Sequence, residues 1–447
     1  MNGTMRTSTT HRPMPAPTAT ALPRLLAGLT PEDGSVGIDE HLARWGPAPF
    51  HSSVELIDTL AASGLTGHGG AWFPVATKWR SIRHGRLRHT VVVGNGAEGE
   101  PASTKDAFLL TRLPHLVLDG LSLAAAALDA AQVVMYVPRP LVRATEAAID
   151  ARRPLGIDSF DIEVVAAPDR FIAGQESAVV NVLNGRREAV PTFIDIDPIR
   201  ERGVNNRPTL VQNVETLAHV ALIARFGADW FRSIGTKASP GTMLMTVTGR
   251  WAHPHVVEAP LGIPLRDVLD LTDAASAVAH YQGALLGGYG GSWVAVPTLF
   301  DLTLSEEAAR RAQSTLGAGV VALLPRGVCP LVETARVVRY MEEQGAGQCG
   351  PCIHGLAGLA DMTQALAYQP AVVRGGVRSV LDLCDLVDGR GACRHPDGVT
   401  RFVRSALSVF TDEVTAHLRG GPCPLVNAPG MLPCPRPAAG LTGGATR

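Results

Sequence analysis

A glycine-rich run at residues 64–74 is the first segment whose residue types suit chemistry. It reads Gly-Leu-Thr-Gly-His-Gly-Gly-Ala-Trp-Phe-Pro, and Lys78 follows closely. Glycines let backbone N–H groups approach a phosphate or a flavin, and a lysine beside them can pair with the phosphate. Because the run is neither a Walker A loop nor the GxGxxG of a dinucleotide fold, a ligand-binding loop and a plain turn both remain open.

Polar residues also follow an apolar segment at 90–94, which reads Thr-Val-Val-Val-Gly and predicts a buried strand. These residues are Asn95, Glu98 and Glu100. In open α/β sheets, ligands bind beyond the carboxyl ends of the strands. The three side chains are therefore placed for ligand binding, and an exposed acidic turn is the alternative.

The cysteines gather near the C-terminus. The chain has seven: Cys329, Cys349, Cys352, Cys384, Cys393, Cys423 and Cys434. Such clustering favours a metal or cluster site over a disulfide framework. The Cys349–Cys352 pair alone is equally typical of a redox pair or of half a zinc site. We expect Cys329 to fill an apolar core, and Cys423 and Cys434 to be free thiols in a proline-rich tail.

Composition excludes several classes of protein. The 447 residues (47.0 kDa) are 46% hydrophobic and 18% charged, with a net charge of −1. This predicts several globular domains and no nucleic-acid or anionic-membrane partner. No apolar run is long enough for a membrane helix, and the first residues lack the apolar core of a signal peptide. No hydrolase or kinase motif is present.

Alternating patterns predict how these motifs are positioned. Expected strands at 90–94, 132–138 and 160–166 alternate with expected helices at 116–130, 141–152 and 174–183. That order is typical of an α/β fold with a mostly parallel sheet and helices on both faces. The chain changes to a small α+β pattern at 241–325 and to helical periodicity at 331–418, where four of the seven cysteines lie.

Five motifs, in order and spacing, resemble the family of flavin-binding 51-kDa (F) subunits of respiratory complex I, which has relatives in NAD-linked hydrogenases and formate dehydrogenases. The likeness covers roughly residues 55–418. The motifs are the glycine run with Lys78 and Trp79, the Asn95–Pro101 loop with Lys105 and Asp106, Phe171–Ser177, Arg207–Leu217, and the cysteine segment.

The resemblance implies a domain order. It consists of a disordered segment at 1–44, a Rossmann-like FMN- and NADH-binding α/β domain at 45–235, a ubiquitin-like SLBB α+β domain at 236–325, a helical iron–sulfur bundle at 326–420 and a Pro/Gly-rich tail at 421–447.

The resemblance also implies site residues. Glu98 and Glu176 would be the catalytic residues beside flavin and nicotinamide. Cofactor contacts would come from Gly67, Gly69, Gly70, Phe73, Lys78, Asn95, Glu98, Glu100, Gly174, Glu176, Gln212, Asn213 and Thr216. Independently of the family, Asn213 and Thr216 are polar at an apolar helix start, which suits anion binding or simple helix capping.

Departures from the family pattern fall mostly on the expected NADH contacts. Trp72 replaces a glycine, and its indole would fill the dinucleotide cleft or stack on the flavin in place of nicotinamide. The other replacements are Ala97 for Asp, Phe171 for Tyr, Gln175 for Glu, and Ser81 and Thr104 for aromatic residues. The FMN contacts are better retained than the NADH contacts.

The family binds a [4Fe–4S] cluster with Cys-x2-Cys-x2-Cys and a fourth cysteine further on. Here Ala346 replaces the first cysteine, while Cys349, Cys352 and Cys393 match the other three. Cys384 would become the fourth ligand through a local shift, or water or His354 would complete the set. An incomplete [4Fe–4S] cluster, a [3Fe–4S] cluster, zinc and no metal remain open.

We therefore expect a flavin and iron–sulfur oxidoreductase that passes electrons from NAD(P)H through FMN to the cluster, and on to a ferredoxin-like or membrane-associated redox partner. An NADH-independent, ferredoxin-linked flavin carrier and a catalytically degenerate structural paralogue are the alternatives. The expected location is cytoplasmic, without membrane insertion of its own, or peripheral at the inner face of the plasma membrane through a partner.

Overall fold

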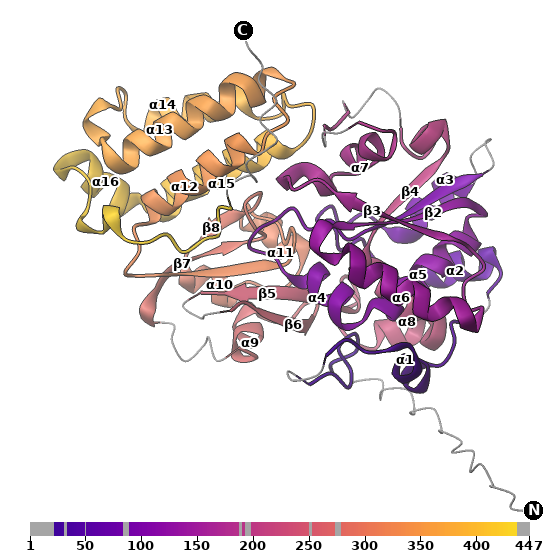
Figure 1. The fold of residues 1–447 in the computed structure, drawn as a ribbon. Helices are drawn as coiled ribbons and strands as arrows, with labels where there is room; N and C mark the ends of the chain where they lie inside the picture. Colours follow the sequence, from indigo (N-terminus) through magenta and orange to yellow (C-terminus); the bar gives the residue numbers. More distant parts are fainter. Residues whose placement is uncertain are drawn as a thin grey trace, which may run out of the picture.

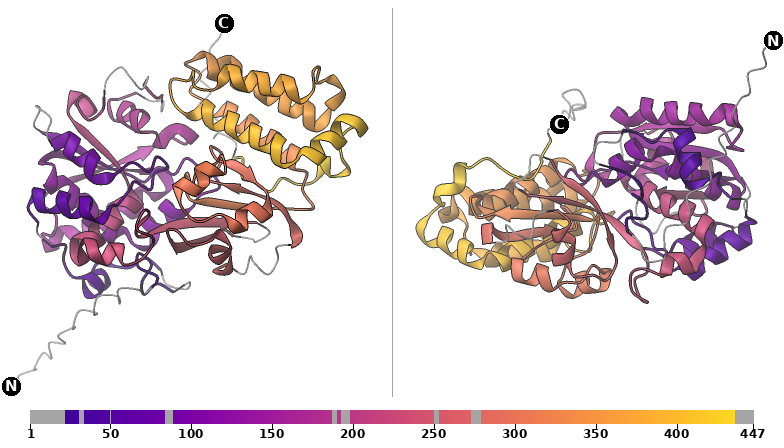
Figure 2. Two further views of the ribbon diagram at one scale, coloured as in Figure 1. Left: turned by 180° about the vertical axis from the view of Figure 1, so that it is seen from behind. Right: turned by 90° about the horizontal axis from the view of Figure 1, so that it is seen from below.

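The computed structural model describes three packed regions: an N-terminal α/β region, a second sheet and a C-terminal helical bundle (Figures 1 and 2). The described residues are 22–30, 34–49, 51–83, 89–186, 190–192, 198–249, 253–272 and 279–435. In Figure 1 the α/β region and the bundle lie on opposite sides, and both contact the second sheet.

The first sheet is fully parallel, with strand order β3-β2-β1-β4. Its strands are β1 (Thr90–Asn95), β2 (Ala130–Pro138), β3 (Ile162–Ala167) and β4 (Thr209–Asn213). The central strand β1 is buried from Thr90 to Gly94, as the apolar run predicts for a strand covered on both faces. The predicted α/β fold with a parallel sheet is confirmed.

Helices cover this sheet and supply most of its core. They are α2 (Ser53–Ser63), α3 (Val75–Arg83), α4 (Lys105–Arg112), α5 (Pro114–Ala127), α6 (Val142–Arg152), α7 (Glu176–Leu183) and α8 (Val214–Arg232). Helices α5 and α8 pack so closely that a Cβ at Gly120 would collide with the backbone of Leu217. Glycine at 120 therefore permits the close approach of the two helices.

The expected disordered segment at 1–44 is wrong for its described part. Helix α1 (Ile38–Trp45) lies within it, and Leu25 and Val36 are 0% and 2% exposed. The Nε2 atom of His41 lies 2.9 Å from a carboxylate oxygen of Asp119 on α5. The apolar contacts and this side-chain hydrogen bond anchor the segment, whereas residues 1–21 and 31–33 lie outside the described part.

The second sheet is mixed, with strand order β6-β5-β9-β7-β8. Its strands are β5 (Thr242–Thr248), β6 (His255–Pro260), β7 (Tyr281–Leu286), β8 (Ser292–Val294) and β9 (Val320–Pro325); helices α9 (Leu265–Asp270), α10 (Val296–Asp301) and α11 (Glu306–Arg311) accompany them. Only β5 and β9 pair in parallel. The SLBB assignment of this region stays a prediction.

The C-terminal bundle contains α12 (Pro330–Glu343), α13 (Ala357–Tyr368), α14 (Val377–Val387), α15 (His395–Val409) and α16 (Thr411–Gly420), and a π-helical turn (Pro351–Leu356) precedes α13. Among the described residues, no single helix is long and apolar enough to span a membrane; α4 and α5 pass such a test only as a pair bent by 97°.

The described part of the expected tail is packed on the bundle. Its short 3-10 helix (Pro424–Asn427) is followed by Leu432, which is 1% exposed. The buried Glu333 carboxylate of α12 accepts hydrogen bonds from the backbone N–H groups of Met431 and Leu432. We call residues 421–435 the C-terminal strap. Residues 436–447 lie outside the described part.

Candidate functional site

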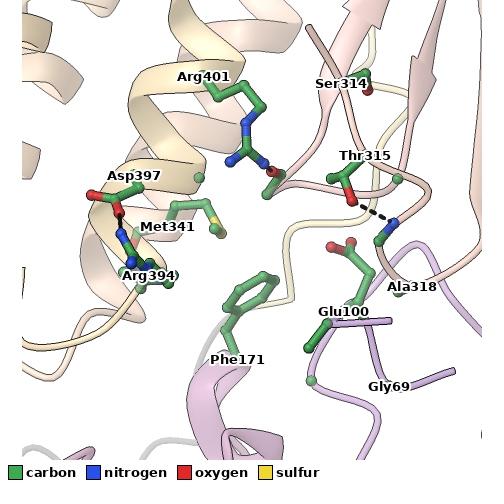
Figure 3. A pocket seen from close by; sticks show the side chains of 18 of the residues that line it. Gly69, Glu100, Phe171, Ser314, Thr315, Ala318, Met341, Arg394, Asp397 and Arg401 are labelled. Carbon is green, nitrogen blue, oxygen red and sulfur yellow. Dashed lines mark hydrogen bonds and ion pairs between the residues drawn. The ribbon is translucent and has the colours of Figure 1, made fainter. Parts of the chain in front are cut away.

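A cavity of about 1190 Å³ lies where the three regions meet. Its walls come from the glycine run, the loop after β1, residues 171–175, the turns around Gly287 and Thr315, and α15. Figure 3 shows Glu100, Phe171 and Met341 reaching toward one space from different parts of the chain. Segments that are distant in the sequence thus form a single binding space.

Two asparagines mark the carboxyl edge of the first sheet. Asn95 and Asn213 are paired residues at the ends of β1 and β4. The Asn213 side chain caps α8 by accepting hydrogen bonds from the N–H groups of Glu215 and Thr216. The Asn95 side chain donates to the Gly174 carbonyl at 2.9 Å. Strand ends and a helix N-terminus therefore meet at the cavity, as anion sites in such sheets require.

The glycine run forms a cradle beside this edge. An antiparallel bridge between Thr66 and Pro74 closes its base, and the His68 N–H donates to the Thr216 hydroxyl at 2.9 Å. Within the described part of the chain, the N–H groups of Gly69, Gly70 and Ala71 have no hydrogen-bond acceptor, although all three residues line the cavity. A Cβ at Gly69 would lie 3.2 Å from the Asn213 Cβ.

Glu98 and Glu100 line the cavity but are held by the fold. Glu98 caps α4, accepting from the N–H groups of Asp106 and Ala107. Glu100 accepts from the Tyr289 N–H at 2.7 Å, which ties the first region to the second sheet. Burial, with the neighbouring Asp106 carboxylate, raises the pKa of Glu98 to about 7, and burial raises the pKa of Glu100 to about 7.

A buried ionic network, which was not among the predicted site residues, lies behind these carboxylates. The Lys105 ammonium is 2.8 Å from both Asp106 and Glu215. Burial alone would lower the Lys105 pKa, but the two carboxylates raise it well above its usual value. Lys105 and Asp106 appeared in the sequence only as part of a motif, and they line the cavity.

The His68 ring lies beside this network. The ring contacts the tilted rings of Trp72 and His219, and burial lowers the pKa of His68 to about 3. His68, Glu215 and His219 lie close enough to hold a metal ion. The ammonium of Lys105, however, already neutralises the Glu215 carboxylate. A neutral His68 is thus part of the support of the glycine cradle.

The structure brings seven of the predicted cofactor residues into the cavity wall: Gly69, Gly70, Asn95, Glu98, Glu100, Gly174 and Asn213. The others do not line it. Lys78 and Glu176 form an ion pair of 2.9 Å, and Lys78 also donates to the Val211 carbonyl. Thus Glu176, unlike Glu98, is not placed beside the cavity.

Four further predicted residues lie behind or outside the wall. Gln212 and Thr216 are buried, at 4% and 0% exposure, and Gly67 lies near Gln212. Phe73 is 52% exposed, so the structure does not place it as a stacking platform in the cavity. Its position follows from the bridge at Pro74, which fixes the adjacent backbone.

The departures from the family pattern have structural roles. Trp72, at φ 53°, packs against the core of the second sheet and is not among the residues that line the cavity. The Ala97 side chain packs against the apolar cluster around Val91 and Val93, and its backbone carbonyl lies against Gly174. Gln175 caps α7 by accepting from the Ala178 N–H. These contacts hold the two loops together.

Three thiols lie close to this cavity. Burial, with the neighbouring thiols of Cys349 and Cys393, raises the pKa of Cys352 to about 12, and Cys393 itself lines the cavity. The N–H group of Gly347 donates to the Cys352 sulfur and lowers the pKa of that thiol. The N–H group of His395 does the same for Cys393. Such N–H···S bonds are typical of iron–sulfur sites.

The fourth cluster position has no thiol. Ala346 packs against Ile172 and Ala173, and the backbone N–H of Phe171 donates to the Gln344 side chain at 2.9 Å. His354 is exposed in the π-helical turn. The site therefore offers a cysteine ligand to three irons of a cluster. Ala346, at the position without a thiol, contacts the segment that lines the cavity.

Cys384 does not join these thiols. It is one of the positions of α14 that face the bundle core, together with Val380 and Val387, and is 0% exposed. Besides burial, the groups that act on its pKa are Arg404, Asp385 and Asp388. Because a helical turn fixes its direction, the local shift needed for ligation would unwind the end of α14.

Helix α15 contributes positive charge to the opposite wall. Arg394, Arg401 and Arg404 all line the cavity. Arg401 donates to the Gly290 carbonyl at 2.7 Å, and Arg394 pairs with Asp397 at 2.9 Å (Figure 3). The Arg394 side chain is 80% exposed, so it lies at the cavity mouth. Guanidinium groups so placed suit the phosphates of a dinucleotide.

Two family models match the chain over these regions. The Nuo51 FMN-binding domain matches residues 60–222, which carry the glycine cradle and both asparagines. The iron–sulfur binding region of NADH-ubiquinone oxidoreductase F matches residues 333–417, which carry the three thiols.

Known proteins are similar over most of the chain. The NADH-quinone oxidoreductase F subunit of Mycobacterium tuberculosis is 32% identical over 401 residues, covering 85% of this chain and 88% of the relative. The F subunit of Escherichia coli is 28% identical, covering 82% and 85%. A crystal structure of NAD+-reducing [NiFe]-hydrogenase superposes with a TM-score of 0.74 at 28% identity; the match covers 83% of this chain and 63% of the hydrogenase chain.

Proposed function

Because the chain belongs to the family of NADH-quinone oxidoreductase F subunits, we propose that it takes electrons from NAD(P)H at the cavity and delivers them through the three-thiol site to a partner subunit. The observation that carries this proposal is the position of Cys393. It lines the same cavity as Gly69, Asn95 and Asn213, so the cofactor cradle and the thiol site are contiguous.

The residues of the cradle fit FMN. The N–H groups of Gly69, Gly70 and Ala71 lack acceptors within the described part of the chain, and a side chain at 69 would fill the space next to Asn213. The N-terminus of α8 would favour the phosphate. When bound there, FMN supplies the exchange between two-electron and one-electron transfer. The protein supplies fixed donors, which need no rearrangement during the reaction.

The carboxyl groups of the wall control charge and protons. Glu98 and Glu100, with pKa values of about 7, change protonation near neutral pH, whereas the neighbouring carboxylates keep the pKa of Lys105 well above its usual value. Protonated, the two carboxyls leave the cavity less negative for an anionic dinucleotide. The arginines of α15 would attract its phosphates from the opposite side.

Electrons would leave through the thiol site. Cys349, Cys352 and Cys393 would hold an iron–sulfur cluster, which accepts electrons singly. The residue at 346 offers no ligand atom, so one iron would depend on water or on a partner. We infer that the acceptor is another subunit of a redox assembly, and that the chain reaches any membrane only through that assembly.

A ferredoxin-linked carrier that does not use NADH is the second candidate. Ala97 and Gln175 favour it, since each replaces a carboxylate expected on the NADH side: Ala97 packs against an apolar cluster, and Gln175 caps α7. The two candidates share the cradle and the thiols and differ in the electron donor.

Filling the cradle tests the cofactor site. We expect Gly69→Val to lose bound FMN, because its side chain would enter the space against Asn213. Gly327→Val is the matched control, since Gly327 has no atom within 4 Å of its added Cβ and should keep FMN. FMN released from each purified, folded protein is measured by fluorescence. Equal FMN in both variants would contradict the placement of the cofactor.

A further inference from the structure

A second cluster of metal-ligand atoms lies at the outer end of the bundle. It consists of Cys329, Glu413, His417 and Cys423, whose ligand atoms all lie within 4.8 Å of one another. Helix α16, which carries two of them, lies on the side of the bundle remote from the α/β region (Figure 1). From this geometry we propose that the four residues form a structural zinc site, separate from the flavin cavity and the three-thiol site.

The distances fit a mononuclear tetrahedral ion. The Cys329 Sγ atom lies 3.7 Å from His417 Nε2 and 3.9 Å from Glu413 Oε1, and the last two atoms are 3.2 Å apart. Bond lengths of zinc to sulfur, nitrogen and oxygen place neighbouring ligand atoms about 3.3–3.8 Å apart in a tetrahedron. Two thiolates, an imidazole and a carboxylate are ligands that zinc commonly takes in proteins.

Each ligand is held by a different local feature. Cys329 precedes the first residue of α12, where the helix N-terminus favours a thiolate. Glu413 and His417 are one turn apart on α16, so they share a face of that helix. Cys423 follows the turn at Gly421, at the start of the C-terminal strap. The set thus joins the start of α12, helix α16 and the strap.

The His417 ring is oriented as a metal ligand usually is. Its Nδ1 atom lies 3.3 Å from the Leu366 carbonyl, an acceptor in the last turn of α13. If Nδ1–H donates to that carbonyl, the Nε2 lone pair points toward Cys329 and Glu413. The Cys423 N–H also approaches Nε2, at 3.2 Å, and this contact would be replaced when the ion binds. His417 is 0% exposed, so its ring nitrogens must find their hydrogen-bond or metal partners within the protein.

The donor set supplies four ligands to one ion. Binding releases the protons of the two thiols, the two thiolates balance the charge of Zn²⁺, and the Glu413 carboxylate in the remaining position leaves the site with one net negative charge. The Glu413 side chain is 33% exposed, which leaves an entry path for the ion.

The site would clamp the strap onto the bundle. Beyond Cys423 the strap reaches Tyr289, whose hydroxyl donates to the Pro433 carbonyl and whose backbone N–H donates to Glu100. A closed zinc site would therefore stabilise a wall of the cavity indirectly, without contact with the reacting groups.

Metal analysis of the complete protein tests this proposal. Zinc, iron and sulfide are measured after anaerobic purification of the wild type and of Cys329→Ser, Cys423→Ser and Cys434→Ser. We expect one zinc per wild-type chain, loss of zinc with retention of iron in the first two variants, and retention of both metals in Cys434→Ser. Zinc that persists in Cys329→Ser, or a wild type that contains none, would overturn the proposal.

Cobalt titration keeps the test valid if the cysteine variants do not fold. Wild-type protein treated with a mild chelator should take up Co²⁺ with thiolate charge-transfer and tetrahedral ligand-field bands, and Glu413→Gln should bind it at least about tenfold more weakly. No such bands, an unchanged affinity, or a Cys329–Cys423 disulfide detected by mass spectrometry under anaerobic conditions would each contradict the zinc assignment. None of these results depends on FMN or NAD(P)H.

Discussion

The bundle contains two groups of cysteines, which differ in spacing and in their other ligands. Cys349, Cys352 and Cys393 interact electrostatically, but they are not among the described groups whose ligand atoms all lie within 4.8 Å of one another. Cys329 and Cys423 belong to such a group, together with His417 and Glu413. We call Cys349, Cys352 and Cys393 the wide group, whose spacing suits a multinuclear cluster. We call Cys329, Glu413, His417 and Cys423 the compact group, whose spacing suits a single ion.

Position in the fold adds to this contrast. The wide group touches the flavin cavity through Cys393 and docks on the α/β region through Ala346. The compact group lies at the other end of the bundle and connects its helices to the C-terminal strap. Within one small bundle, ligand spacing and location therefore separate an electron-transfer site from a structural one.

The largest expected effect separates the two metals. Cys393→Ser removes one of only three thiolates of the wide site, so we expect most of the iron and the broad iron–sulfur absorption to be lost. Zinc should stay, because Cys393 is not among the zinc ligands. Iron and zinc are measured in the same sample. Parallel loss of both metals would show that the two sites are not independent.

A smaller effect is expected from completing the wide site. Ala346→Cys restores a thiol at the position where the family has its first cysteine, so iron per chain and the lifetime of the cluster in air should both rise. Electron paramagnetic resonance of the reduced protein should shift from a mixture of cluster types toward a [4Fe–4S] signal. Ala346→Ser is the control for side-chain size. No change in Ala346→Cys would mean that a ligand from elsewhere already completes the cluster.

The smallest expected effect is a pH dependence of stability that comes from Glu100 in the cavity wall. Burial raises the pKa of Glu100 from 4.5 to about 7, so the folded state binds this proton more tightly than the unfolded state. The stabilisation is fully present below pH 4.5 and is lost as pH rises through about 7. A shift of this size corresponds to about 3 kcal/mol. In Glu100→Gln the melting temperature should therefore fall less between about pH 5 and about pH 8 than in the wild type. An equal fall in melting temperature in both proteins would contradict the raised pKa of Glu100.

The sequence predicted the first sheet well because its strands are continuous apolar runs and its loops carry matching motifs. Thr90 to Gly94 is buried as expected, and Asn95 and Asn213 meet at the strand ends. The packing of the described N-terminal part and of the strap was not predicted, because their few buried residues, such as Leu25 and Leu432, stand among turn-forming residues. Local composition does not reveal such long-range packing.

The candidate site was predicted in part for similar reasons. The glycine run and the cysteine spacing could be recognised in the sequence. The ion pair between Lys105 and Glu215 could not, because it forms only when the fold brings the two residues together. The packing of Trp72 could not be predicted, since the direction of its side chain depends on the second sheet. Cys329 and Cys423 are far apart in the sequence, and no local spacing indicates that they share a site with His417.

The central claim is that electrons pass from NAD(P)H to flavin and then to the wide thiol site. The most direct test is the absorption spectrum of anaerobically purified protein before and after addition of NADH or NADPH. We predict flavin bands and a broad iron–sulfur shoulder that both bleach on addition of one of the two. Flavin that responds to neither nucleotide but bleaches with dithionite or reduced ferredoxin would contradict the claim and favour the ferredoxin-linked carrier.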